Sequence, residues 1–303
     1  MRIMLAALAF LAASPALADT PPVVVDTPVT GSLVQQVLGA GGQVQVLLPQ
    51  GASAHHHQMR PSDARSLQDA GLLVWTGPEL TPWLDRSAAS LAGGAAQLRL
   101  LEVPGTRLRS YGGDHGHDHD HGHEPDHDHG GTDPHAWLDP ANAQAWLAAI
   151  ADALAKADPD NAAQYAQNAQ VAAQRIADLD ADLQARLAPH KGASFVVFHD
   201  AYGYFTDHYG LRPAIAVSLG DASTPSAARL AEIRDEIAAT GAVCAFPEYA
   251  SDPKLVETMI QGTKVRMGDE LSPEGGALPV GADLYAGIMT RMAASLADCL
   301  SGQ

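Results

Sequence analysis

The feature that most constrains the fold is one long, uninterrupted helical segment near the middle of the chain. Residues 160–187 are rich in Ala, Gln and Leu and contain neither Pro nor Gly. At ~1.5 Å of rise per residue, such a helix spans ~40 Å, which is longer than one small domain requires. We therefore expect it to be a rigid connector between two parts of the chain. The alternative is an ordinary surface helix of a single domain.

Short apolar runs alternate with amphipathic stretches on the amino-terminal side of this helix. The apolar runs are bounded by Gly, Pro or Asp and are typical of buried strands; they lie at 23–25, 44–48, 72–75 and 98–103. Residues 31–38 and 60–70 have helical spacing, and Ser62 is the N-cap candidate of the second. This alternation predicts an α/β lobe with a mainly parallel sheet.

The same alternation resumes after Pro189. Strands are predicted there at 194–198, 214–217, 242–246 and 265–267, and helices at 201–209, 226–240, 253–262 and 282–300. A further helix is predicted at 140–156, just before the long helix. The predicted domains are an amino-terminal lobe at 19–158, the connecting helix at 159–188 and a carboxyl-terminal lobe at 189–303. The predicted fold class is α/β, with two lobes of mainly parallel sheet joined by one long rigid α-helix.

The first eighteen residues have the pattern of a cleaved secretory signal peptide. Arg2 supplies a positive charge, residues 3–13 are apolar, and Ala16, Leu17 and Ala18 form a small-residue cleavage site. A membrane anchor needs ~20 apolar residues, and this run is shorter. We therefore expect an exported, periplasmic protein with no membrane anchor.

The charge balance narrows the range of partners. The 303 residues carry 18 Lys and Arg against 35 Asp and Glu, a formal net charge of −17. This charge repels phosphate backbones and anionic lipid surfaces, which argues against nucleic acid and membrane binding. It favours cations, and 14 histidines beside only two cysteines indicate imidazole and carboxylate ligands instead of a thiolate zinc finger.

The two cysteines are Cys244 and Cys299. An even number of cysteines in an exported chain favours a disulfide, here between the last helix and a strand of the same lobe. The alternative is two free buried thiols.

A low-complexity insertion at 112–131 consists almost entirely of Gly, Asp and His. Such a composition cannot form a core, so we expect a surface loop. Its imidazoles suit Zn(II), Ni(II) or Cu(II) at several weak sites, because an unstructured ligand set loses entropy each time it binds. The alternative is a solubilising loop with no role in metal binding. The loop histidines are His115, His117, His119, His121, His123, His127 and His129.

Four residues outside this loop are candidates for one tight metal site. Ligands of open α/β sheets lie beyond the carboxyl ends of the strands, and His55, His135, His199 and Asp283 have such positions. Taken singly, each histidine more often belongs to a hydrogen-bonded core, and Asp283 reads as a helix N-cap. Asp133, Asp139 and Asp200 are predicted acceptors for the imidazole N–H groups, whereas His56, His57, His190 and His208 are expected to be solvated.

Three segments carry a resemblance to a known family. GASAHHHQMRPSDARSLQDAGLLVWTGPELTPWL, DPHAWLDP and VVFHDAYGYF are similar to the metal-binding segments of the periplasmic zinc-binding proteins of zinc and manganese ABC transporters. Members with a fourth, carboxylate ligand have it in a segment similar to ADLYAGIM. The resemblance implies one metal ion in a cleft between the lobes, delivered to an inner-membrane permease. It also implies the ligands His55, His135 and His199, with Asp283 as a fourth, carboxylate ligand. Many relatives have an acidic residue where this chain has Ala54. Its absence here favours Asp283 as the ligand that completes the metal shell.

Three imidazoles and one carboxylate suit tetrahedral Zn(II). Manganese sites carry more oxygen, and manganese-selective relatives resemble this pattern with a carboxylate in place of His199. Two alternatives remain, a zinc hydrolase and a periplasmic zinc buffer or metallochaperone without a transporter. The sequence has no HExxH helix and no GxSxG motif, but a hydrolase would gain support if Asp283 were not a ligand. We expect a monomeric binding protein with no enzymatic activity, whose partners are the permease and a zinc metallochaperone.

Overall fold

The computed structural model describes residues 21–111, 131–218 and 225–302. The named strands of these ranges form two four-stranded sheets, with orders β2-β1-β3-β4 and β6-β5-β7-β8, and all neighbouring strands are parallel. The two sheets use the same order relative to the chain, so the lobes share one topology. The predicted fold class is confirmed.

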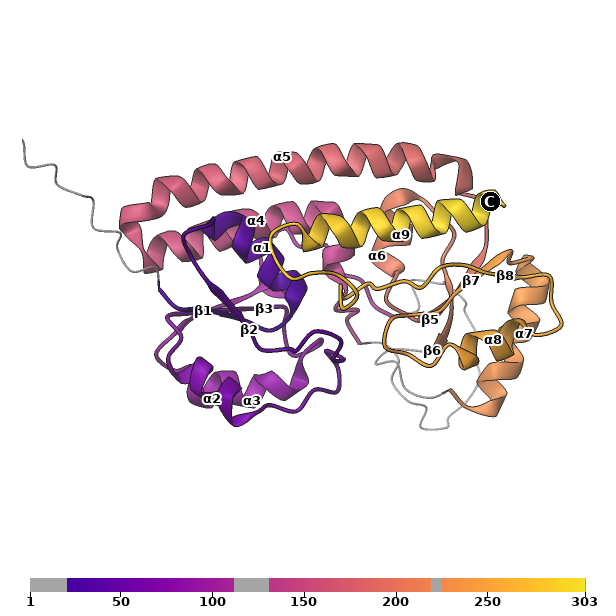
Figure 1. The fold of residues 1–303 in the computed structure, drawn as a ribbon, viewed down its shortest axis with the longest axis horizontal. Helices are drawn as coiled ribbons and strands as arrows, with labels where there is room; N and C mark the ends of the chain where they lie inside the picture. Colours follow the sequence, from indigo (N-terminus) through magenta and orange to yellow (C-terminus); the bar gives the residue numbers. More distant parts are fainter. Residues whose placement is uncertain (1–20, 112–130, 219–224, 303) are drawn as a thin grey trace, which may run out of the picture.

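The first sheet is covered by helices on both faces (Figure 1). Its strands are β1 (Val23–Val25), β2 (Val44–Val46), β3 (Leu72–Trp75) and β4 (Ala96–Arg99). Its helices are α1 (Pro28–Leu38), α2 (Pro61–Gln68), α3 (Pro82–Leu91) and α4 (Pro140–Ala157). Val24, Leu73 and Trp75 pack against α2 and α3, whereas the alternate strand residues pack with α1 and α4. This division follows from the two-residue period of a strand, which turns successive side chains to opposite faces.

The second sheet is built in the same way. Its strands are β5 (Phe195–His199), β6 (Ile215–Ser218), β7 (Cys244–Phe246) and β8 (Arg266–Met267). Its helices are α6 (Gly203–Tyr209), α7 (Ala227–Thr240), α8 (Lys254–Ile260) and α9 (Leu284–Ser301). Val196, Ile215 and Val217 pack against α7 and α8, and the other face packs in the main core with α6 and α9.

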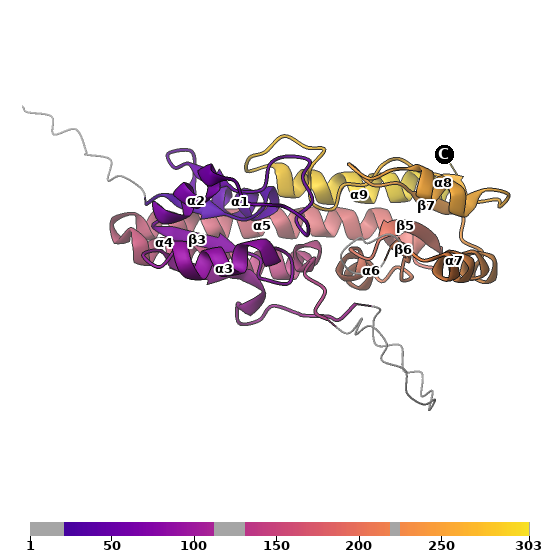
Figure 2. The same cartoon turned by 90° about the horizontal axis from the view of Figure 1, so that it is seen from below.

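The long helix α5 (Ala162–Leu187) runs above both lobes (Figure 1). Its buried positions recur at spacings of three, four or seven, which places them on one face of the helix; they are Tyr165, Ala169, Ala172, Ile176, Leu183 and Leu187. This face contacts α1, α4 and α9. Helix α9 lies beside α5 in both views and contacts α1 in the other lobe, so α9 is a second brace between the lobes (Figures 1 and 2).

Apart from shifts of one to three residues at the ends of elements, the local predictions differ from the structure in three places. Helix α3 was not predicted, because only Leu84 and Ala88 are buried in it and its apolar periodicity is weak. The run at 98–103 is only partly a strand, since a 3₁₀ turn (Leu100–Glu102) follows β4. The N-cap of α2 is Arg60 instead of Ser62, because the Asp63 carboxylate accepts a 2.8 Å hydrogen bond from the Arg60 backbone N–H.

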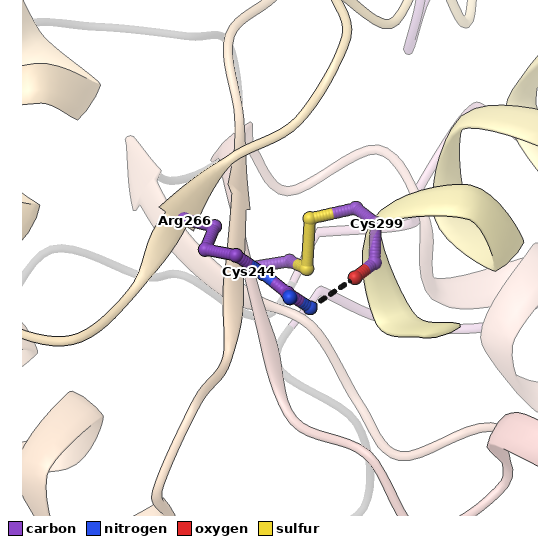
Figure 3. The surroundings of a disulfide bond; sticks show 3 residues. All are labelled: Cys244, Arg266 and Cys299. Carbon is purple, nitrogen blue, oxygen red and sulfur yellow. Dashed lines mark hydrogen bonds between the residues drawn. A yellow bond between two sulfur atoms is a disulfide. The ribbon is translucent and has the colours of Figure 1, made fainter. Parts of the chain in front are cut away.

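The predicted disulfide between Cys244 and Cys299 is confirmed. It joins the first residue of β7 to the last turn of α9, and the Arg266 guanidinium of β8 donates a hydrogen bond to the Cys299 carbonyl beside it (Figure 3). The carboxyl-terminal end of α9 is therefore attached to two neighbouring strands of the second sheet.

The predicted signal peptide at 1–18 and the seven loop histidines lie outside the described residues. Within the residues that are described, none of the helices combines the length and the apolar character needed to cross a bilayer.

Candidate metal centre

Three of the four predicted ligands converge between the two lobes. One nitrogen each from His55, His135 and His199, together with one carboxylate oxygen of Glu274, lie within 4.8 Å of one another. His55 lies on the loop after β2, His135 immediately before a 3₁₀ turn (Ala136–Leu138), and His199 is the last residue of β5. The three imidazoles are buried, with ring centroids 5.2 to 6.3 Å apart. This donor set matches the preference of Zn(II) for imidazole nitrogen and carboxylate oxygen.

His135 is oriented by Asp133, one of the three predicted acceptors. The Asp133 Oδ1 atom lies 2.8 Å from His135 Nδ1 and accepts a 3.0 Å hydrogen bond from the His135 backbone N–H. A carboxylate at Nδ1 favours the tautomer that carries its proton there, which leaves Nε2 available as a ligand. Both residues are fully buried, so this orientation is protected from water.

His199 is oriented by Glu248, which the sequence analysis did not single out. The Glu248 Oε2 atom lies 2.6 Å from His199 Nδ1 and accepts a 3.2 Å hydrogen bond from the Tyr202 hydroxyl. The register of the sheet pairs Val197 of β5 with Phe246 of β7, and each functional residue follows two positions later. The rule that located His199 beyond the end of β5 would also have located Glu248 beyond the end of β7.

The free nitrogens of these two rings point at each other. His135 Nε2 and His199 Nε2 are 3.4 Å apart, while carboxylates hold both Nδ1 atoms. Two imidazole lone pairs at this separation repel unless a proton or a metal ion lies between them. The pair of rings can therefore share either a proton or a metal ion.

The pKa values indicate that His199 carries a proton between the two rings, which a metal ion can replace. Burial lowers the pKa of His135 to well below its usual value, and the charge of His199 acts in the same direction. Burial also acts to lower the pKa of His199, but the charge of Glu248 and its hydrogen bond raise that pKa to about 9. Burial raises the pKa of Glu274 to about 7, against the influence of His199. Burial likewise raises the pKa of Asp133 to about 7, opposed by its hydrogen bond to His135 and the charge of Arg109.

Glu274 lies on the loop between β8 and α9. The Ala54 backbone N–H donates a 3.4 Å hydrogen bond to its Oε2 atom, so this carboxylate lies beside the residue that precedes His55. The carbonyl of Pro273 accepts a 3.0 Å hydrogen bond from Trp137 Nε1, and the Trp137 ring packs edge-on against His135. This contact fastens the Glu274 loop to the segment that carries His135.

Asp283, the predicted fourth ligand, does not lie with the three histidines. Asp283 is exposed at the start of α9 and is not part of the converging group. Ser32 of α1 donates a 2.9 Å hydrogen bond to the Ala282 carbonyl and accepts one of 3.1 Å from the Tyr285 N–H, which fixes the start of α9 against the first lobe. Asp283 has the position of a helix N-cap, and the carboxylate that lies with the three histidines is that of Glu274.

The remaining histidines and acceptors have other surroundings. His56 is exposed, as expected, whereas His57 is partly buried against Trp83 and lies 3.7 Å from Asp63. His208 is not a solvated residue, because its two nitrogens lie 3.0 Å from Asp139 and 2.8 Å from Asp180. The Asp139 carboxylate therefore pairs with His208 and accepts a hydrogen bond from the Ala141 backbone N–H in the first turn of α4. The charge of Asp200 acts on His199, but it is a minor influence beside Glu248.

A cavity of ≈ 310 Å³ leads from this group to the surface. His55, His199, Glu248 and Glu274 line this cavity together with the exposed His56. The metal centre is therefore buried but reachable from solvent on the side of His55 and Glu274.

Comparison with known proteins places the chain in a zinc-uptake family. Residues 23–299 match the model of a family described as zinc-uptake complex component A, periplasmic. The chain is 58% identical over 317 residues to the high-affinity zinc uptake system protein ZnuA of Paracoccus denitrificans, covering 98% of this chain and 97% of that protein. It is 37% identical to the protein of the same name from Brucella suis, covering 92% and 91% of the two chains.

Solved structures share the fold. The periplasmic zinc-binding protein TroA of Treponema pallidum superposes with a TM-score of 0.78 at 21% identity, covering 93% of this chain and 99% of TroA. A crystal structure of ZnuA gives the same score and identity, covering 93% and 100%. The family model and the curated relatives both extend over nearly the whole chain, and the chain belongs to the family of periplasmic zinc-uptake component A proteins.

Proposed function

We propose that this chain captures Zn(II) in the periplasm with His55, His135, His199 and Glu274 and delivers it to an inner-membrane ABC permease. Its family is the periplasmic zinc-binding component of ABC zinc transport. The observation that carries the proposal is the pair of facing Nε2 atoms, 3.4 Å apart, each on a ring whose other nitrogen is held by a carboxylate. Carboxylate–histidine pairs of this kind orient imidazoles for a metal and make them stronger ligands.

The donor set supports zinc over manganese. Three imidazole nitrogens and one carboxylate oxygen complete a tetrahedral shell, which zinc accepts at Zn–N distances of about 2.0–2.1 Å. Manganese prefers oxygen-rich sites, and Glu274 is the single oxygen donor of this group. Copper and nickel bind imidazoles tightly as well, so selection among these metals depends on geometry and supply.

The same donor set argues against a zinc hydrolase. A catalytic zinc keeps one coordination position open for water beside three protein ligands. In this proposal Glu274 is the fourth protein ligand and fills that position, which is supported by its place beside the three histidines. A closed shell suits retention and delivery of the ion, so we propose that the chain is not an enzyme.

The His-rich loop and the signal peptide complete the proposal. We propose that His115, His117, His119, His121, His123, His127 and His129 bind additional zinc weakly, and that the mature chain begins at Asp19. The acidic, imidazole-rich composition of the loop supports the first point, and the apolar run before Ala18 supports the second.

The test is zinc affinity, measured by competition with a chromogenic chelator on the purified mature chain. Alanine at His55, His135 or His199 should lower the affinity by about a hundredfold or more, since each removes a ligand; E274Q should cost about tenfold to a hundredfold. The matched control is D283N, which removes one carboxylate of the same lobe and should change the affinity less than about twofold.

The outcome also separates the two carboxylates. Loss of affinity in D283N with none in E274Q would refute the assignment of the fourth ligand. Retention of tight zinc binding by the histidine variants would refute the site as a whole. Delivery is tested by growth in chelator-limited medium, where the H135A/H199A variant should not support zinc uptake by a strain that depends on this chain.

A further inference from the structure

Arg109 lies behind the metal centre and contacts both lobes. Its side chain is only 18% exposed, and its guanidinium lies over the Tyr204 ring of α6, 5.8 Å from the centroid. Its Nη1 atom is 3.7 Å from Asp133 Oδ2, and its Nε atom is 3.4 Å from Asp207 Oδ2. One cation therefore bridges the carboxylate behind His135 and a carboxylate on a helix of the second lobe.

The backbone around Arg109 is held by the same groups. The Asp133 N–H donates a 2.9 Å hydrogen bond to the Arg109 carbonyl, next to an antiparallel bridge between Ser110 and Thr132. The Tyr204 hydroxyl accepts a 3.0 Å hydrogen bond from the Arg109 N–H and donates one of 2.9 Å to the Asp133 carbonyl. Arg109 and Asp133 are thus fixed to each other and to α6.

Asp133 needs a positive neighbour. Its side chain is about 1% exposed, and its Oδ1 atom already serves both the backbone and the ring of His135. Its Oδ2 atom faces Arg109, whose guanidinium is the one Arg or Lys group within 4.0 Å of this carboxylate in the described ranges. A buried carboxylate without a cation nearby is costly, so the pair determines where Asp133 can lie.

The fit between Arg109 and α6 is close. A side-chain carbon added at Gly203, the first residue of α6, would overlap the guanidinium. The arginine therefore rests directly on the backbone of the second lobe. A larger residue at this position would displace the guanidinium without removing its charge.

We infer that Arg109 is a positioning residue for zinc, which holds Asp133 against His135 by bridging it to Tyr204 and Asp207 of the opposite lobe. This inference rests on the proposed function. If Arg109 has this role, the strength of His135 as a zinc ligand depends on the position of α6 relative to residues 131–135. Movement of α6 would shift Arg109, loosen Asp133 and weaken the Nε2 ligand, although α6 itself contributes no ligand.

The test compares two arginines of the same segment. R109A should weaken zinc binding about five- to twentyfold, less than the loss expected for a direct partner of a ligating histidine. The control is R107A, which removes an equal charge two residues earlier in the chain. The Arg107 side chain is 71% exposed and pairs with Asp139 instead of Asp133. R107A should change the affinity less than about twofold. R109K should restore part of the loss, since an ammonium can still pair with Asp133 but lacks the planar guanidinium that also lies over Tyr204.

Two further measurements distinguish positioning from a general loss of structure. In the D133N variant, the additional change R109A should lower zinc affinity by less than about twofold, because Arg109 acts on His135 through the Asp133 carboxylate. The visible d–d bands of the Co(II)-loaded protein should change in R109A and return towards wild type in R109K. Should R109A fail to fold, G203A and R109K carry the test, with G203A expected to weaken zinc binding while the charge is kept.

The outcomes are separable from those of the proposed function. A wild-type chain without tight zinc binding would refute the function. Tight binding by wild type, combined with unchanged affinity in R109A and G203A, would overturn only the role of Arg109. An equal loss in R107A and R109A, or an undiminished effect of R109A in the D133N background, would overturn that role as well.

Discussion

Removal of the disulfide between Cys244 and Cys299 should destabilise the chain without removing its zinc site. The cross-link closes a loop of 55 residues, and its effect on the entropy of the unfolded chain corresponds to about 4 kcal/mol at 25 °C. A protein of this length has an unfolding entropy near 0.6 kcal/mol/K, so the expected shift in Tm is about 7 °C.

The disulfide lies at the opposite end of its sheet from the metal. Cys244 begins β7, whereas His199 ends the neighbouring parallel strand β5. The hydrogen bond from Arg266 to the Cys299 carbonyl requires no sulfur and should keep the last turn of α9 on the sheet after reduction. We therefore expect the zinc affinity of the reduced protein to stay within about threefold of the oxidised value.

The assay is urea unfolding of three samples, followed by circular dichroism. They are the oxidised chain, the same chain in reductant and the C244A/C299A variant. The reduced chain keeps both buried sulfurs and isolates the cross-link, whereas the variant should lose a further ~1–2 kcal/mol of packing. A reduced chain destabilised by less than about 1 kcal/mol would refute the loop argument, and a tenfold loss of zinc affinity would refute the separation of disulfide and site.

Three further predictions follow from the charges and the insertion. The hydrogen bonds from His208 to Asp139 and Asp180 raise the pKa of His208 in the folded chain, so its contribution to the free energy of unfolding is complete below about pH 6.5 and is lost as pH rises through this raised pKa. In urea unfolding, H208Q should cost about 1–3 kcal/mol at pH 5.5 and less at pH 9. An equal cost at both pH values would contradict the pairing. Because the pKa of His199 is raised to about 9, zinc binding near pH 7.5 should release about one proton, and chelator competition should show affinity falling steadily from pH 8.5 to 5.5; a flat profile would exclude imidazole ligation. Deletion of residues 113–130 should remove weak zinc binding and leave one tight site, and loss of the tight site in the same titration would contradict a centre built from the two lobes.

Elements with a strong local signal could be predicted from the sequence. The strand at 72–75 has its predicted bounds, and the long helix was located to within two residues. Buried strands are short and continuously apolar, and a helix without Pro or Gly has few places to end. Helix α3 buries only Leu84 and Ala88, so its helical period could not be separated from a loop.

The metal site shows where this reasoning stops. His199 and Glu248 follow neighbouring strands, so a rule based on strand ends reaches both. Glu274 follows no such rule, because its position depends on the path of a loop that Trp137 and Ala54 hold from the first lobe. Asp283 had the better local signal at the start of a helix, but contacts between α9 and Ser32, 250 residues away, leave it at the surface. Tertiary contacts of this kind are not encoded in local pattern.

The two braces between the lobes also determine how zinc can leave. Helix α9 is fixed to α1 through Ser32 at one end and to β7 through the disulfide at the other, and α5 packs along both lobes. A wide opening would break the contacts of Ser32 with α9 and the packing of α5 against one of the lobes, whereas His55 and Glu274 lie on loops beside the cavity. We therefore expect zinc exchange through movement of these two loops, with a radius of gyration from small-angle scattering that differs by less than about 1 Å between the apo and zinc-loaded forms. A larger expansion on zinc removal would show that the helices yield and that the lobes separate.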